Sequence, residues 1–165
     1  MEIINSIIIM AILLNTNNQT FNKDINEDAP IIEKQNIYIP ASPKKVWEVI
    51  SEINHWPEWQ SEVTQAEITG EVQEGTVFKW KAGGISFTSK LHTVVESRAI
   101  GWTGKTLGTK AVHNWYLETS KEGTTVHVEE SLQGLLPILF KKKFSRDLHL
   151  GMQKNLNELL NACSI

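Results

Sequence analysis

Two ionisable side chains, His113 and Glu130, are placed to work together as a general acid and a general base. Each lies in a stretch of alternating apolar and polar residues, and one tight turn at Glu122-Gly123 joins the two stretches. The alternation puts both side chains on the inward face of a hairpin, where a carboxylate beside an imidazole can move a proton. The pair also has a non-catalytic explanation, in which His113 satisfies a hydrogen bond in the core and Glu130 lies in water at the sheet rim. A one-residue slip of register would replace Glu130 with Glu129.

Tryptophan is the other conspicuous residue type, with 6 in 165 residues. Four consecutive predicted strands carry aromatic or polar side chains at inward positions. These are Trp80 on the first, Phe87 and Ser89 on the second, Trp102 on the third and Trp115 on the fourth. Indole rings bring large apolar area and one N–H donor each, so this group forms either an aromatic core or the wall of an apolar pocket. Ser89 could donate a hydrogen bond to a ligand. It does not sit in a Gly-x-Ser-x-Gly motif, so we do not expect a nucleophile.

Other chemistries are disfavoured. Gly104-Lys105-Thr106 resembles the end of a phosphate-binding loop, but Ala99 occupies the position of the first glycine and no helix is predicted to follow. No Cys/His pair has metal-ligand spacing, so we expect no metal and no cofactor. The net charge of −3 disfavours a nucleic-acid partner. The one basic run, residues 141–143 with Arg146, indicates a solvated helix face or a contact for an anionic head group.

The elements that must position these residues follow a simple order after residue 30. Alternation and turn residues predict a strand, two helices, six strands and a long helix. The predicted strands span residues 31–39, 63–72, 76–81, 85–96, 100–106, 112–119 and 125–132. Ser42-Pro43 and Pro57 begin the two early helices, and an apolar residue every fourth position predicts one amphipathic helix over 136–162. This order predicts an α+β fold in which a curved antiparallel sheet wraps around the C-terminal helix and leaves a cavity.

Residues 1–30 are expected to be a flexible N-terminal segment, followed by one domain over 31–163. Ile3 to Leu14 is apolar but too short to span a bilayer, and it lacks the basic start and the cleavage site of a signal peptide. We therefore predict a cytoplasmic protein, with an atypical signal or anchor in the apolar N-terminus as the alternative, and we expect no membrane contact except through residues 3–14. The single cysteine, Cys163, fits a reducing compartment.

Two motifs carry a family resemblance. Residues 39–50, Ile-Pro-Ala-Ser-Pro-Lys-Lys-Val-Trp-Glu-Val-Ile, are similar to the "I-x-A-P-x-x-x-V-W" opening of the START/Bet v 1-like (SRPBCC) superfamily. Trp56-Pro57-Glu58-Trp59 resembles its "W-P-x-W" second helix. Over about residues 31–163 the chain looks closest to the polyketide cyclase/dehydrase-like group. The resemblance implies a helix-grip fold with an apolar tunnel between helix and sheet, but the motifs are specific for fold and not for activity.

The sequence as a whole favours the binding of a small, mostly apolar organic molecule between the sheet and the C-terminal helix. The predicted ligand-binding residues are Trp80, Phe87, Ser89, Trp102, His113, Trp115, Glu130, Phe144, Leu148 and Met152. One alternative is a polyketide cyclase/dehydratase-like enzyme that uses His113 and Glu130 as acid and base. Another is a regulatory or stress protein with a filled core and no ligand.

Overall fold

A single seven-stranded antiparallel sheet forms the body of the molecule, with strand order β1-β7-β6-β5-β4-β3-β2. The computed structural model describes residues 23–106 and 108–164. The strands are β1 (Ile31–Ile39), β2 (Val63–Ile68), β3 (Val77–Ala82), β4 (Ile85–Val95), β5 (Ala99–Thr106), β6 (Thr109–Ser120) and β7 (Gly123–Gly134). The predicted sequence of elements along the chain, one strand, two helices and six further strands before the C-terminal helical region, is confirmed. The predicted strand over 63–72 ends earlier, at Ile68, and β6 and β7 begin before the predicted positions.

Three short helical elements carry the chain from β1 at one edge of the sheet to β2 at the other. They are α2 (Pro43–Ser51), a 3-10 turn (Ile53–His55) and α3 (Trp56–Trp59). The α2 helix begins as predicted, because the Ser42 hydroxyl accepts a hydrogen bond from the Lys45 N–H at 3.3 Å. The Trp56 indole N–H donates to the Ile50 carbonyl at 2.8 Å and so joins α3 to α2.

The C-terminal region differs from the prediction of one helix over 136–162. It forms a short helix α4 (Leu135–Leu139) and a long helix α5 (Lys141–Cys163), separated at Phe140, whose φ of −117° and ψ of 35° are not helical. One amphipathic helix with an apolar residue at every fourth position would place Phe140 against the sheet, together with Phe144, Leu148 and Met152. That expectation is wrong for Phe140, because the break turns its side chain outward and leaves it 53% exposed. The four-residue spacing of apolar residues continues through the break, so the pattern concealed it.

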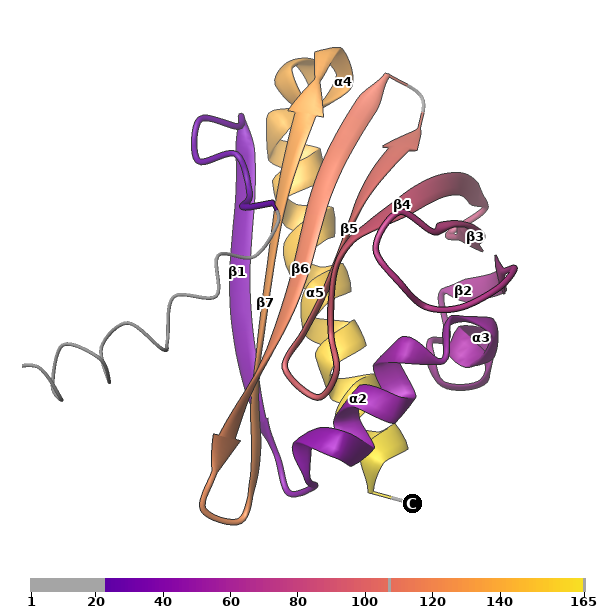
Figure 1. Ribbon diagram of the computed structural model, residues 1–165. Coiled ribbons are helices and arrows are strands. Elements are labelled where there is room, and N and C mark those ends of the chain that lie inside the picture. The colour runs from indigo at the N-terminus through magenta and orange to yellow at the C-terminus, as the bar shows by residue number, and fades with distance from the viewer. Residues whose placement is uncertain (1–22, 107, 165) are drawn as a thin grey trace, which may run out of the picture.

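Helix α5 crosses the concave face of the sheet (Figure 1), but the two are in close contact over only part of their length. Met152, Leu156 and Leu159 are buried in one hydrophobic core with inward residues of the sheet such as Leu117 and Val126. Phe144 and Leu148, nearer the start of α5, are only partly buried. The core thus fills one end of the space under the helix and leaves the other end open. None of the helices in the described part of the chain is long and apolar enough to cross a membrane.

Residues 23–28 are packed against the convex face of the sheet, within the segment predicted to be flexible. Ile25 is 5% exposed, the Asn26 N–H donates to the Ser131 hydroxyl at 3.1 Å, and the Asn114 side-chain amide donates to the Lys23 carbonyl at 3.2 Å. This part of the predicted flexible segment is therefore held by the domain. Residues 1–22, including the apolar residues 3–14, lie outside the described part of the chain.

Candidate functional site

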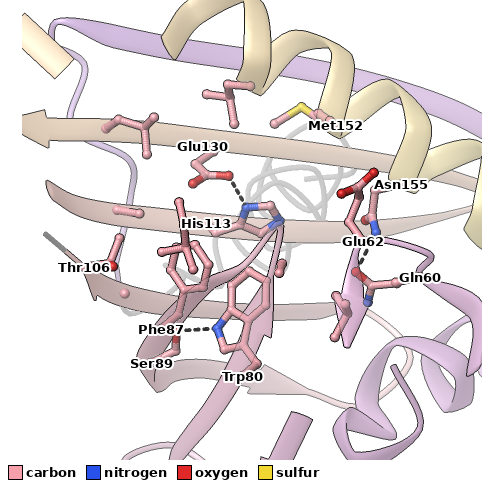
Figure 2. Close-up of a pocket in the computed structure, with 18 of the residues that line it drawn as sticks. Gln60, Glu62, Trp80, Phe87, Ser89, Thr106, His113, Glu130, Met152 and Asn155 are labelled. Carbon is pink, nitrogen blue, oxygen red and sulfur yellow. Dashed lines mark hydrogen bonds and ion pairs between the residues drawn. The ribbon is translucent and has the colours of Figure 1, made fainter. Parts of the chain in front are cut away.

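A cavity of about 470 Å³ lies between the concave face of the sheet and α5, which lines it with residues between 143 and 158. Figure 2 shows its polar and aromatic lining. All ten residues predicted to bind a ligand line this cavity, namely Trp80, Phe87, Ser89, Trp102, His113, Trp115, Glu130, Phe144, Leu148 and Met152. The structure thus brings them together, and their role in binding stays a prediction. A space of this size is within the range of small-molecule sites.

Aromatic rings make up much of the wall and fix one another in place. Trp80 stacks on Phe87 with ring centroids 4.4 Å apart, and it also meets Trp56 edge-on at 5.8 Å. Trp102 stacks on His113 at 4.6 Å. Rings held in this way present a preformed apolar surface. Both explanations offered for the tryptophans hold in part, because Trp102 is buried with the core and also lines the cavity.

His113 and Glu130 face each other on neighbouring strands, in the register that the alternation predicted. The Nδ1 atom of His113 lies 2.6 Å from the Glu130 carboxylate, and both side chains are largely buried. An ionised carboxylate only accepts hydrogen bonds, so with Glu130 in that form the contact requires a proton on Nδ1. The other nitrogen, Nε2, is buried and has no hydrogen-bond partner within the described residues. The pair can therefore hold a proton, but a neighbouring side chain must move before Nε2 can reach a ligand.

Ser89 is more constrained than the sequence suggested. It is 2% exposed, and its hydroxyl accepts a hydrogen bond from the Trp80 indole N–H at 3.1 Å. The contact fixes the orientation of Trp80 in the wall. The Ser89 hydroxyl proton can still be donated.

The cavity also has a polar border that no sequence pattern predicted, where the segment after α3 meets α5. The Asn155 amide donates to the Gln60 carbonyl oxygen at 2.7 Å, and Glu62 and Lys154 form an ion pair at 2.5 Å. These four residues also line the cavity. The hydrogen bond that Lys154 donates to the Glu62 carboxylate raises the pKa of Lys154, so this amine stays charged at neutral pH. The partners are more than ninety residues apart in sequence, and no local pattern predicts such a pairing.

Metal and thiol chemistry find no support in the described part of the chain. Residues 23–106 and 108–164 contain no group of three His, Cys, Asp or Glu side chains placed to hold a metal ion. Burial raises the pKa of Cys163 to about 11, so its sulfur is a protonated thiol at neutral pH and a poor nucleophile.

Comparisons with known proteins place this geometry in context. Residues 33–162 match the model of the family described as polyketide cyclase/dehydrase and lipid transport. No curated protein sequence matches the chain. A hypothetical protein from Helicobacter pylori superposes with a TM-score of 0.74 at 14% identity, over 84% of this chain and 95% of that one.

Two solved structures with functional names are also similar. The Zhui aromatase/cyclase from Streptomyces sp. R1128 has a TM-score of 0.71 at 15% identity, over 81% of this chain and 93% of that one. The di-domain ARO/CYC StfQ from the steffimycin biosynthetic pathway also has a TM-score of 0.71 at 15% identity, over 81% of this chain and 51% of that one. At such identities the likeness establishes the shared fold and nothing further.

Proposed function

Because the chain belongs to the polyketide cyclase/dehydrase and lipid transport family, we propose that it binds a small, mostly apolar organic molecule in the cavity under α5. The family assignment confirms the resemblance inferred from the two motifs. The observation that carries the proposal is the cavity itself, whose volume is about 470 Å³. A filled core would leave no such space between α5 and the sheet. This observation disfavours the alternative of a protein with a filled core.

The wall favours a ligand that is flat and largely apolar. The stacked pairs Trp80–Phe87 and Trp102–His113 offer rigid ring faces. Three buried ring nitrogens of the wall, Nε1 of Trp59, Nε2 of His113 and Nε1 of Trp115, have no hydrogen-bond partner among the described residues. Sites of this kind take most of their affinity from apolar contact and their specificity from a few polar groups. We assign the polar selection to His113, Glu130 and Ser89.

Filling the cavity from the sheet tests the proposal. Ala111 lies on the inward face of β6 and lines the cavity, whereas its neighbour Lys110 points to the opposite face and is exposed. Ala111→Phe should abolish the binding of the apolar fluorophore N-phenyl-1-naphthylamine, and Lys110→Phe should leave its affinity unchanged. Equal binding by both variants would refute the cavity as the site. If only Ala111→Phe loses binding, native mass spectrometry of the protein purified from its own host would identify the natural ligand.

A second candidate function is acid–base catalysis of cyclisation or dehydration, and the 2.6 Å contact between His113 and Glu130 favours it. The enclosure of His113 Nε2 counts against it in this conformation. For an enzyme, Glu130→Gln should stop turnover of a polyketide-like substrate and leave its dissociation constant nearly unchanged. For a carrier, the same substitution should change the dissociation constant alone.

The remaining parts of the proposal concern the whole chain. We place the protein in the cytoplasm, since its one cysteine is a free thiol and fits a reducing compartment. We also keep residues 31–163 as the folded domain, with residues 23–30 attached to it.

A further inference from the structure

Four large apolar side chains are exposed side by side at one end of the molecule. Leu135, Ile138, Leu139 and Phe140 are 65%, 61%, 62% and 53% exposed, and together they make up most of α4 and its junction with α5. We call this group the α4 patch. In Figure 1, α4 projects beyond the end of the sheet. Apolar side chains gathered in this way on a protein surface mark a site of interaction.

A basic cluster follows the α4 patch directly in the chain. Lys141, Lys142, Lys143 and Arg146 are all exposed on the first turns of α5. Asp147 pairs with Lys143 and Arg146, but Lys141 and Lys142 form no ion pair within the described residues. The surface therefore combines exposed apolar groups with unneutralised positive charge at their border.

We infer that this end of the molecule docks on the surface of an anionic lipid bilayer. The α4 patch would insert among the acyl chains near the headgroups, and the lysines would contact the lipid phosphates. Such a pairing of apolar and basic side chains is what an interfacial membrane element requires. A protein partner with an apolar groove accounts for the α4 patch, but it does not account for the positive border unless it is also acidic.

This surface adjoins the cavity. Leu136 of α4 lines the cavity, and so do Lys143 and Phe144 of α5. Docking would bring this part of the cavity wall to the bilayer, so that an apolar ligand could pass between the two without crossing water. That last consequence rests on the proposed function, whereas the docking itself does not.

The test measures co-sedimentation of the full chain with vesicles. We expect binding to phosphatidylcholine vesicles that contain about one third phosphatidylserine, weaker binding to pure phosphatidylcholine, and a loss of binding at high salt. Leu139→Asp and Leu135→Asp, tested separately, should each weaken binding by roughly tenfold. Lys141→Glu with Lys142→Glu should weaken it by about fivefold for each lysine replaced. N-Phenyl-1-naphthylamine binding, measured on the same variants, reports on the cavity independently.

Matched controls separate this surface from others. Val77→Asp replaces an apolar residue that is 50% exposed on β3, and Lys121→Glu reverses a charge at the opposite end of the β6–β7 hairpin. Both should bind vesicles like the wild type. Ile8→Asp tests residues 3–14, and a loss of binding confined to this variant would overturn the inference. Absence of vesicle binding by the wild type would overturn it too, as would α4 variants that change self-association in sedimentation but not vesicle binding.

Discussion

His113 and Glu130 oppose each other across β6 and β7, and a hydrogen bond of 2.6 Å joins Nδ1 to the carboxylate. The ring also stacks on Trp102, so its position is fixed on two sides. Ser89 is fixed in the same way by Trp80. Single residues of the wall thus hold one another, and this leaves a preformed but mostly apolar lining. For a ligand, shape and apolar area matter more here than polar contacts.

Phe144 should contribute less to stability than a phenylalanine in the core. Phe78 is 1% exposed in the packed core, whereas Phe144 is partly buried and faces the cavity. Phe78→Ala should lower the free energy of unfolding by about 3–5 kcal/mol, and Phe144→Ala by only about 1 kcal/mol. Urea denaturation of both variants measures the difference. Equal losses would mean that Phe144 is packed as tightly as the core.

His92 should make the protein less stable in acid. Burial, together with the charge of Lys23, lowers the pKa of His92 from 6.5 to about 4 in the folded state. The unfolded chain therefore binds more protons between these values, and stability is lost as the pH falls through that window. Between about pH 7 and pH 5 this residue should remove about 2 kcal/mol from the free energy of unfolding.

His92→Gln supplies the comparison, because it removes the titrating ring. The loss of stability between about pH 7 and pH 5 should be about 2 kcal/mol smaller in the variant than in the wild type. Urea denaturation at the two pH values measures both losses. If the variant and the wild type lose the same amount, His92 is not the group responsible.

At the scale of elements, the alternation of apolar and polar residues was sufficient to predict the strands. The four-residue spacing of apolar residues was not sufficient to predict where the C-terminal helices begin and end. The inward positions of β6 and β7 were predicted residue by residue, since a buried face of a strand repeats every second position. The break between α4 and α5 was missed, because Leu136, Phe140 and Phe144 keep the spacing of one continuous helix. The same pattern concealed the exposed surface of α4. A break of this kind depends on tertiary packing, which no local spacing records.

Gly151 in the middle of α5 is one place where the helix can be improved. A Cβ atom at this position would meet no other atom within 4 Å, and the residue lines the cavity. Gly151→Ala should therefore raise the free energy of unfolding by about 0.5–1 kcal/mol, because alanine favours the helical backbone. Gly151→Trp should raise the free energy of unfolding by less than Gly151→Ala does, and its indole should compete with N-phenyl-1-naphthylamine for the cavity. Destabilisation by Gly151→Ala would contradict this account of α5.

The packed N-terminal segment should add measurable stability. Ile25 is 5% exposed on the convex face of the sheet, although it lies in a segment whose composition predicted flexibility. Ile25→Ala should lower the free energy of unfolding by about 2 kcal/mol. Val77→Ala, at a residue that is 50% exposed, should change it by less than about 0.5 kcal/mol. Equal effects of the two substitutions would show that residues 23–28 do not support the sheet.

The whole molecule is divided between a filled core at one end of α5 and a cavity at the other. The family motifs and the order of elements predicted the fold, and all ten predicted wall residues do line the cavity. The size of that cavity could not be predicted, because it depends on how far α5 stands from the sheet. Contacts between distant segments, such as Gln60 with Asn155 and Glu62 with Lys154, also border the cavity, and no local pattern predicts them.

A ligand that fills the cavity should therefore stabilise the entire domain. A molecule that binds only the folded state, present at about one hundred times its dissociation constant, adds about 2.7 kcal/mol to the free energy of unfolding. For a domain of this size the melting temperature should rise by roughly 5–10 °C. Differential scanning fluorimetry with N-phenyl-1-naphthylamine, or with a ligand found by native mass spectrometry, measures the shift. Lys110→Phe should show the same shift and Ala111→Phe none, because only the second side chain occupies the space that the ligand needs. A shift that persists in Ala111→Phe would place the binding site elsewhere on the molecule.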